Sequence, residues 1–326
     1  ATVEPSVTAP GPTASPDNLP DPEPSEAGSP PTPAPGTAES NSSGGLRFIT
    51  YNVENWLTMD RFDLETKQTH PSTPKPDAEK ARVVEILTAI RPDALGVCEI
   101  GTADDVAELQ QRLQAAGVDL PYTELAHGGD PARRLALLSR LPIKTRNTQT
   151  TLTYQIGAQT LPFQRGILDV TIAITPTFDL HLLGVHLKSM RTVSEADQAE
   201  MRRNEARLLR LHIDSIFTQE PGACILAYGD FNAHRNEPSL AEIMGSPRSA
   251  ETSLTDVLLR DANGEVWTHF WDTADIYSRL DYCFTSRLLR PHIDTRSSFV
   301  HADRDFYKAS DHRPLVLKIS PAPILK

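Results

Sequence analysis

Polar side chains stand where several short apolar runs of this sequence begin or end. A carboxylate, amide or imidazole occupies such a position six times: Asn52, Glu99, His186, the pair Asp230 and Asn232, Asp281, and the pair Asp311 and His312. A single Asp or Asn beside a strand is usually a turn former. Six such positions are hard to explain as turns, and strand ends along one edge of a sheet converge. We therefore expect these side chains to line a single pocket.

Carboxylates that share a pocket need a positive charge beside them, and a hard divalent cation supplies it through oxygen ligands. Glu99, Asp311 and the Asn52 amide are oxygen donors of the kind that Mg²⁺ or Mn²⁺ binds. The sequence contains no His-Glu-x-x-His motif, so a protease-like zinc site is not expected. These three residues are the predicted metal ligands, and Mg²⁺ or Mn²⁺ is the predicted cofactor.

The two histidines of this set stand beside carboxylates, where an imidazole can carry protons or stabilise developing negative charge. Asp281 can fix the tautomer of His312 and stabilise its imidazolium form. No Gly-x-Ser-x-Gly motif is present, so attack by water is favoured over a covalent intermediate. Metal, acids, histidines and arginines together suit hydrolysis at phosphorus, where catalysis is mainly positioning and charge stabilisation.

The elements that must position these residues are many strands and few helices. Apolar residues at helical spacing predict helices over 77–90, with Asp77 as N-cap, and over 103–116 and 195–217. Without regular alternation of strand and helix, the pattern favours packed sheets flanked by helices. Strands are predicted over 46–53, 93–100, 135–143, 166–174, 180–187, 224–231, 279–286 and 314–320.

The chain has 326 residues and a net charge of −11, but its composition is uneven. Residues 1–45 contain 11 of the 27 prolines and no Lys or Arg, so we expect a disordered Pro-rich spacer. Residues 46–326 then form one catalytic domain with 37 acidic and 32 basic residues, a net charge of −5. An acidic domain has no broad field for nucleic acid, so any polyanion site must be a local cluster.

Membrane and compartment signals are sparse. No stretch approaches the roughly 18 consecutive apolar residues that a membrane helix needs, so no transmembrane segment is expected. The spacer favours a secreted or cell-envelope protein, and an inert tail is the alternative. Three cysteines cannot form a disulfide framework, and each stands in an apolar run that predicts burial: Cys98, Cys224 and Cys283.

Seven segments, in chain order, resemble the endonuclease/exonuclease/phosphatase superfamily: TYNVEN, CEI, SRLPI, HLKS, GDFNAH, RLDYCF and SDHRPL. The resemblance runs from about Leu46 to Ser320. This superfamily includes deoxyribonucleases, apurinic endonucleases, tyrosyl-DNA phosphodiesterases, inositol polyphosphate 5-phosphatases and bacterial sphingomyelinases. The resemblance implies an α/β (α+β) fold, a four-layered α/β-sandwich of two packed, mainly antiparallel sheets flanked by helices.

The resemblance also implies roles for the polar residues. Asn52 and Glu99 match the family's Asn and metal-binding Glu, and Asp311 matches a further acid on the metal side. Asp230 and Asn232 match the pair that orients or activates the attacking water and holds the phosphate.

The remaining motif positions concern the two imidazoles. His312 and Asp281 match the family's imidazole and its carboxylate partner. His186 matches a position where the deoxyribonuclease-like, phosphatase-like and sphingomyelinase-like branches carry His and apurinic endonucleases carry Tyr. Either Asp230 or His312 is then the general base, while His186 stabilises or protonates the leaving group.

Two arginines are predicted to bind substrate phosphate. Arg165 stands just before a strand, where many family members place such an Arg, and Arg134 is preferred over its neighbour Arg133. A guanidinium fork suits phosphate oxygens better than Lys does. Four further arginines are interpreted, with Glu200 and Glu205, as a solvated helix face: Arg202, Arg203, Arg207 and Arg210.

The sequence therefore predicts a metal-dependent phosphodiesterase that hydrolyses nucleic acid by in-line attack of water, acting as a monomer. The alternative is a phosphomonoesterase or phospholipase C acting on inositol phosphates or sphingomyelin. A lipid enzyme should expose an apolar hairpin near its site, and the sequence shows no obvious cluster of that kind. A catalytically dead phospholigand-binding relative is disfavoured because Glu99, Asp230, Asp281 and His312 are all present.

Overall fold

A computed structural model of the chain describes residues 45–63 and 66–324. The predicted spacer over 1–45 lies outside the described residues except for Gly45, and a secreted or cell-envelope location stays a prediction. No helix in the described ranges is long and apolar enough to cross a membrane. All three cysteines are free; Cys98 and Cys283 are buried as predicted, whereas the prediction is wrong for Cys224, which is only half-buried.

The first sheet has six strands, of which only the neighbours β1 and β4 run parallel. In spatial order the strands are β17 (Phe299–Val300), β18 (Leu315–Ile319), β1 (Leu46–Trp56), β4 (Ala94–Ile100), β6 (Arg134–Ser139) and β5 (Tyr122–Ala126).

The second sheet also has six strands, and again a single pair, β11 and β12, is parallel. In spatial order the strands are β13 (Leu254–Asp256), β16 (Asp281–Ser286), β12 (Ile225–Asp230), β11 (Phe178–His186), β10 (Leu168–Thr175) and β7 (Ile143–Arg146).

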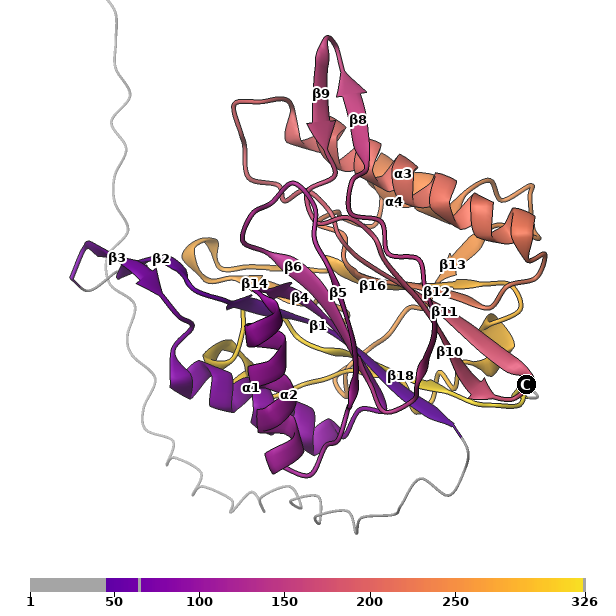
Figure 1. Cartoon of the computed structure of the whole chain (residues 1–326), viewed down its shortest axis with the longest axis horizontal. Helices are drawn as coiled ribbons and strands as arrows, with labels where there is room; N and C mark the ends of the chain where they lie inside the picture. The colour runs from indigo at the N-terminus through magenta and orange to yellow at the C-terminus, as the bar shows by residue number, and fades with distance from the viewer. Residues whose placement is uncertain (1–44, 64–65, 325–326) are drawn as a thin grey trace, which may run out of the picture. The chain divides into compact units, whose positions relative to one another are not determined.

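Two pairs of helices cover the outer faces of these sheets (Figure 1). The first sheet packs against α1 (Asp77–Ile90) and α2 (Ala103–Ala115), and the second against α3 (Gln198–Gln219) and α4 (Pro238–Met244). A third apolar cluster fills the space between the sheets, and Phe48 of β1 belongs to it. These four layers confirm the predicted α/β-sandwich of two mainly antiparallel sheets.

The helices begin and end close to their predicted bounds, and α1 has the predicted range. The predicted cap of α1 is different, because Pro76 is the N-cap residue and Asp77 is the first helical residue. Helix α3 is capped as its sequence suggests, since the Asp197 carboxylate accepts hydrogen bonds from the backbone N–H groups of Ala199 and Glu200.

The prediction of a single strand over 135–143 is wrong. The segment contributes to two strands, β6 and β7, which belong to different sheets. Between them the Ser139 hydroxyl accepts from the Leu141 backbone N–H and donates to the Leu141 carbonyl, which closes a turn. Pro142 follows and cannot donate to a ladder, so the chain leaves the first sheet and enters the second.

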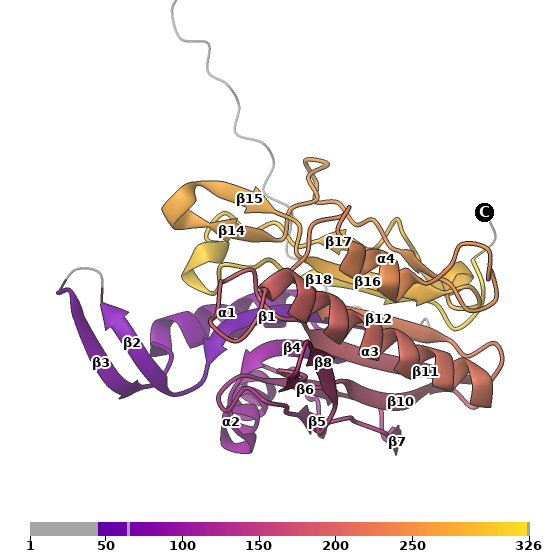
Figure 2. The same ribbon diagram turned by 90° about the horizontal axis from the view of Figure 1, so that it is seen from above.

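Three hairpins and three short 3₁₀ helices complete the described elements. The hairpins β2–β3 and β14–β15 both project from the side of the sheets where β1 ends (Figure 2). The hairpin strands are β2 (Met59–Asp63), β3 (Gln68–Thr73), β8 (Thr153–Ile156), β9 (Gln159–Pro162), β14 (His269–Trp271) and β15 (Ile276–Ser278); the 3₁₀ helices are η1 (Asp272–Ala274), η2 (Arg290–His292) and η3 (Phe306–Lys308).

Candidate functional site

The two sheets bring the carboxyl ends of their parallel strand pairs to one place. The Asn52 side-chain amide in β1 donates a hydrogen bond of 3.1 Å to Asp230 at the end of β12. Strands β16 and β18 run antiparallel to these neighbours, so their first residues reach the same edge. Asp281 begins β16 and His312 precedes β18, which adds both residues to the site.

One row of the second sheet carries three of the predicted residues. Asp230 lies opposite His186 in β11 and opposite Asp281 in β16, and each of the three is 2% exposed. Gly229 precedes this row with a φ of 130°, and a Cβ there would lie 2.0 Å from the Val185 carbonyl oxygen. Only glycine fits, so the close approach of β12 to β11 depends on this residue.

Three side-chain nitrogen atoms lie near Oδ2 of the Asp230 carboxylate. Besides the Asn52 amide, the Nε2 atoms of His186 and His312 lie 3.5 Å and 3.7 Å from Asp230 Oδ2. Burial raises the pKa of Asp230 to about 7, while the His312 cation opposes that rise and Asp281 adds to it. A carboxyl with this pKa can gain or lose a proton near neutral pH.

His312 is held as a cation by its carboxylate neighbours. Its Nδ1 atom lies 2.7 Å from Asp281 Oδ2. Burial alone would lower the pKa of His312, but the charges of Asp281 and Asp230 outweigh burial and raise that pKa well above its usual value. The Ser310 hydroxyl joins this residue to β1, because it donates to the Asn52 carbonyl and accepts from the His312 backbone N–H.

His186 has the opposite protonation. Burial first, and then the Arg165 cation, lower the pKa of His186 well below its usual value, so the imidazole is neutral. Its Nε2 atom faces two carboxylates, with Glu99 Oε1 at 3.9 Å and Asp230 Oδ2 at 3.5 Å. Its buried Nδ1 has no hydrogen-bond partner among the described residues. Nε2 is therefore the nitrogen that carries the proton.

The Asn52 amide is turned so that its nitrogen faces the acids. Its Oδ1 atom accepts a 3.0 Å bond from the Glu54 backbone N–H, which fixes the orientation of the amide. Its Nδ2 lies 3.1 Å from Asp230 Oδ2 and 3.4 Å from Glu99 Oε1. Asn52 thus acts as a hydrogen-bond donor within the site, and metal ligation by this residue stays a prediction.

Asn232 fastens the loop that follows His186. Its backbone N–H donates to Asp230 Oδ1 at 2.9 Å, and its side-chain amide donates to the Leu187 carbonyl at 3.1 Å. The residue adopts a left-handed φ of 47°, which Asn tolerates better than most residues. It therefore ties the ends of β11 and β12 together beside the reacting groups.

Glu99 occupies an irregular position at the end of β4. The ladder with β6 shifts register between Cys98 and Ile100, and Glu99 has a φ of 63°. Opposite this bulge, Glu54 and Asn55 have φ values of 46° and 56°, and the Asn55 backbone N–H donates to Glu99 Oε2 at 3.1 Å. Bulges and strained backbone of this kind re-aim side chains at functional sites.

Two arginines reach the site, although only one of them is a predicted residue. Arg165 is 7% exposed; its Nη2 lies 3.1 Å from Asp130, while its Nε and Nη1 atoms have no partner among the described residues. Arg133 Nε lies 3.6 Å from Glu99 Oε2. Arg134, the preferred candidate, is the first residue of β6 and makes no side-chain bond to a site acid within the described ranges. Arg133 directly precedes β6 and Arg134 begins it, and of the two it is Arg133 that lies beside Glu99.

Two further residues contact the site, and sequence reasoning assigned neither of them to it. His269 Nε2 lies 3.7 Å from Asp311 Oδ2. Lys75 is buried, donates to the Glu54 carbonyl at 3.0 Å and pairs with Glu79. His269 stands between Trp267 and Trp271, where the sequence suggests ring stacking or simple packing, but no local signal indicates Asp311 as its partner. Lys75 carries no signal that distinguishes it from an exposed lysine.

The interpretation of the α3 charges as a solvated face is wrong for several of them. Arg202 is 2% exposed and donates to the Lys188 carbonyl at 3.1 Å. Glu205 is fully buried and accepts from the backbone N–H groups of Gln164 at 2.9 Å and Lys188 at 2.6 Å. Burial raises the pKa of Glu205 to about 7 against the effect of these N–H groups. The helix thereby fastens the loops beside Arg165 and His186.

The donor set fits a hard divalent cation. Glu99 and Asp311 offer carboxylate oxygens that are partly exposed, with 17% and 41% of their side chains accessible. The crowding of like charges is visible at Asp230, whose pKa rises partly because Asp281 and Glu99 lie nearby. A divalent cation beside these carboxylates would offset that repulsion, and oxygen ligands are those that Mg²⁺ and Mn²⁺ bind.

Solved structures with similar folds come from several organisms. The human Nocturnin catalytic domain with bound sulfate is 18% identical with a TM-score of 0.60, covering 85% of this chain and 94% of that chain. An endonuclease/exonuclease/phosphatase from Beutenbergia cavernae DSM 12333 is 20% identical with a TM-score of 0.58, covering 86% and 73%. Truncated Caenorhabditis elegans TDP2 is 18% identical with a TM-score of 0.54, covering 85% and 97%. At these identities the likeness establishes the fold alone.

The sequence itself identifies the family. None of the curated proteins matches this chain. The Endonuclease/Exonuclease/phosphatase family model, in contrast, matches residues 49–312, a range that begins in β1 and ends at His312. This range contains every residue that converges on the site described above. The chain therefore belongs to the endonuclease/exonuclease/phosphatase family of divalent-metal-dependent phosphoesterases.

Proposed function

We propose that this chain is a phosphodiesterase that cleaves nucleic acid by in-line attack of water on phosphorus. The observation that carries the proposal is the Asp230 carboxylate, buried between a neutral and a cationic imidazole. Such a set can remove one proton, deliver another and stabilise negative charge within one small volume.

Asp230 is the proposed general base. Its pKa of about 7 suits removal of a proton from water at neutral pH, whereas His312 is already protonated through its bond to Asp281. This assignment selects one of the two bases that the sequence left open. His186 carries its proton on Nε2, on the side of the acids, where it can donate to the leaving oxygen.

Hydrogen-bond donors at this edge of the sheets are the proposed phosphate-binding groups. The Asn52 amide nitrogen and His312 Nε2 lie 3.5 Å apart, and both are donors, so they share acceptors instead of bonding to each other. Arg165 adds two buried nitrogen atoms, Nε and Nη1, that have no partner in the described ranges. A divalent ion, when bound by Glu99 and Asp311, supplies further positive charge to the phosphate oxygens.

Nicking of supercoiled plasmid tests the proposal. We expect nicking with Mg²⁺ or Mn²⁺, none with EDTA, and a loss of orders of magnitude in His312→Ala with an almost unchanged melting temperature. The exposed His127 provides a matched control, and His127→Ala should nick at the unaltered rate. Full activity in His312→Ala would contradict the mechanism, and absence of nicking by the folded chain would contradict the substrate.

A lipid phosphodiester is the second candidate, and the β14–β15 hairpin favours it. Contrary to the sequence expectation, the hairpin exposes apolar residues close to the site. Trp271 and Ile276 face each other across the two strands and are 55% and 47% exposed, and Tyr277 is 54% exposed. The same hairpin contains His269, which lies beside Asp311. An apolar tip of this kind suits insertion into a lipid surface, although its rings can also stack on bases.

The double variant Trp271→Ala, Ile276→Ala distinguishes the two candidates. If the substrate is lipid, the variant should lose binding to sphingomyelin vesicles and at least tenfold in their hydrolysis. If the substrate is nucleic acid, vesicles should not be hydrolysed at all, and plasmid nicking should be the activity that the variant alters. A headgroup-sized soluble phosphodiester serves as the control, because its turnover does not depend on a surface.

A further inference from the structure

A backbone ladder places an imidazole beside the predicted metal ligand Asp311. His269 pairs with His312 in a β-bridge. On either side of this bridge, the Phe270 backbone N–H donates to the Asp311 carbonyl at 2.9 Å, and the Arg313 N–H donates to the Thr268 carbonyl at 2.6 Å. Main-chain hydrogen bonds therefore hold the backbones of His269 and Asp311 next to each other.

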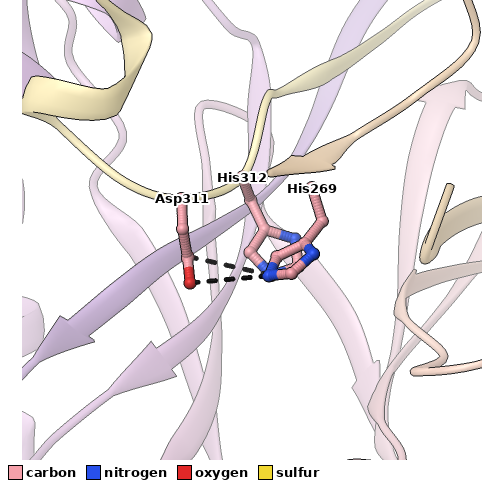
Figure 3. Close-up of side chains that lie close together, drawn as sticks. All are labelled: His269, Asp311 and His312. Atoms are coloured by element: carbon pink, nitrogen blue, oxygen red, sulfur yellow. Dashed lines mark ion pairs between the residues drawn. The ribbon is translucent and has the colours of Figure 1, made fainter. Parts of the chain in front are cut away.

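The side chains of this ladder converge on one carboxylate. His269 Nε2 lies 3.7 Å from Asp311 Oδ2, and His312 Nε2 lies 3.9 Å from Asp311 Oδ1 (Figure 3). These three ligand atoms lie within 4.8 Å of one another. Bonds from a metal to nitrogen or carboxylate oxygen are about 2.0–2.2 Å long, so one ion can join atoms up to about 4.2 Å apart. The His269–Asp311 separation falls inside this limit.

The two imidazoles differ in their freedom to bind an ion. His312 is bonded through Nδ1 to Asp281, and its Nε2 also faces Asp230. Both ring nitrogens of His312 therefore already face buried carboxylates of the second sheet. His269 has 19% of its side chain exposed and faces Asp311 through Nε2, which leaves it accessible to an ion.

The backbone beneath Asp311 is also fixed. The Asp311 N–H donates to Glu54 Oε2 at 3.1 Å. Lys75 holds Glu54 in turn. Its side chain is fully buried, and its Nζ atom donates to the Glu54 carbonyl at 3.0 Å. Ligands whose own positions are fixed by neighbouring groups bind metals more tightly.

We infer that His269 is a nitrogen ligand, beside Asp311, for the divalent ion of the proposed reaction, and that it makes the site prefer Mn²⁺ and other first-row transition ions to Mg²⁺. Mg²⁺ binds oxygen and retains several waters, so an imidazole adds little to its affinity. Transition ions accept imidazole nitrogen readily. The inference rests on the metal dependence contained in the proposed function, and it goes further by naming a ligand and a metal class.

The test is electron spin echo spectroscopy of the full chain loaded with Mn²⁺, which detects a directly bound ¹⁴N nucleus. We expect ¹⁴N modulation in the unaltered chain and in His127→Gln, and its loss in His269→Gln. The Kd for Mn²⁺, obtained from the electron paramagnetic resonance signal of the free ion, should be about tenfold weaker in His269→Gln. The Kd for Mg²⁺, measured by competition with Mn²⁺, should change less than twofold in the same variant.

Three outcomes would overturn the inference. The first is bound Mn²⁺ without ¹⁴N modulation, and the second is modulation that survives in His269→Gln but disappears in His312→Gln. Both outcomes contradict the assignment of His269 as a metal ligand. They leave the proposed function standing, because neither measurement uses a substrate. The third is the absence of any Mn²⁺ or Mg²⁺ binding, which contradicts the metal dependence of the proposed function as well. A circular dichroism melt of each variant checks that the loss is local.

Discussion

The second sheet holds His186, Asp230 and Asp281 inside its ladders, whereas the first sheet presents Glu99 from an irregular strand end. The three residues of the second sheet lie in one register row and are each 2% exposed. Glu99, in contrast, has a left-handed backbone and 17% of its side chain exposed.

This difference separates two chemical tasks. Regular ladders bury groups whose pKa values must be shifted, because burial and fixed neighbours produce such shifts. Irregular strand ends turn carboxylate oxygens toward the surface, where an ion or a phosphate can reach them. In the proposed reaction, the second sheet thus holds the general base and the neutral imidazole, and the first sheet supplies an oxygen ligand. Asp311, with 41% of its side chain exposed, belongs with the ligands.

Replacing the proposed base gives the largest expected effect. Asp230→Asn keeps the shape of the side chain but cannot accept a proton, so kcat should fall about 10³-fold. Stability should not fall, since the change removes a buried carboxylate whose pKa burial raises to about 7. Steady-state kinetics and a thermal melt check both statements. A kcat within tenfold of the unaltered chain at every metal concentration would place the base elsewhere.

The next largest effect is expected from Gly229, which directly precedes the buried row. Gly229→Ala should destabilise the fold by about 3 kcal/mol or more, because the new Cβ would meet the Val185 carbonyl oxygen at 2.0 Å. Gly117 is a matched control, since its φ is also positive at 81° but nothing lies within 4 Å of its Cβ position. Gly117→Ala should cost only about 1 kcal/mol. Urea unfolding measures the pair, and equal losses would contradict the steric explanation.

The buried acid of α3 predicts a pH dependence of stability. The pKa of Glu205 is about 7 in the fold against an ordinary value of 4.5, so its contribution is fully present below about pH 4.5. That contribution declines as the pH rises to about 7 and is constant above it. Relative to Glu205→Gln, the unaltered chain should lose up to about 3 kcal/mol between pH 4.5 and pH 8. Urea unfolding of both proteins at several pH values measures this difference, and parallel curves would refute it.

The smallest expected effect tests the other side of the comparison. Glu99→Gln removes a charged oxygen ligand but no proton acceptor, so the metal concentration for half-maximal activity should rise about tenfold. Saturating Mn²⁺ should restore most of kcat, whereas it should not rescue Asp230→Asn. Activity titrations with Mn²⁺ on both variants make the comparison. Rescue of both, or of neither, would show that the two sheets do not divide the chemistry in this way.

Local patterns were sufficient to predict much of the architecture. The helix over 77–90 and the strand that became Ala94–Ile100 have strong periodicity and clear ends, so the sequence places them correctly. The division of 135–143 between two sheets could not be predicted in this way. It depends on where two separate ladders form, and a serine turn with a following proline is common inside ordinary loops.

The site shows the same limit at the level of single residues. Whether Arg133 or Arg134 turns toward Glu99 depends on the residue at which β6 begins, and strand bounds are the least certain part of any sequence reading. His269 stands 42 residues before Asp311, and the pairing of β14 with the segment before β18 brings the two together. Glu205 is buried because two loops cross α3, a tertiary fact with no helical signature.

The register row also restricts how the chain can change in length. A one-residue insertion or deletion within β12 would turn Asp230 to the opposite face of the sheet and separate it from both partners in the row. The turns of β8–β9 and β14–β15 lie outside the two large ladders, so they can lengthen or shorten without that penalty. Under the proposed function, these two hairpins can therefore vary in length while the register row of Asp230 stays unaltered.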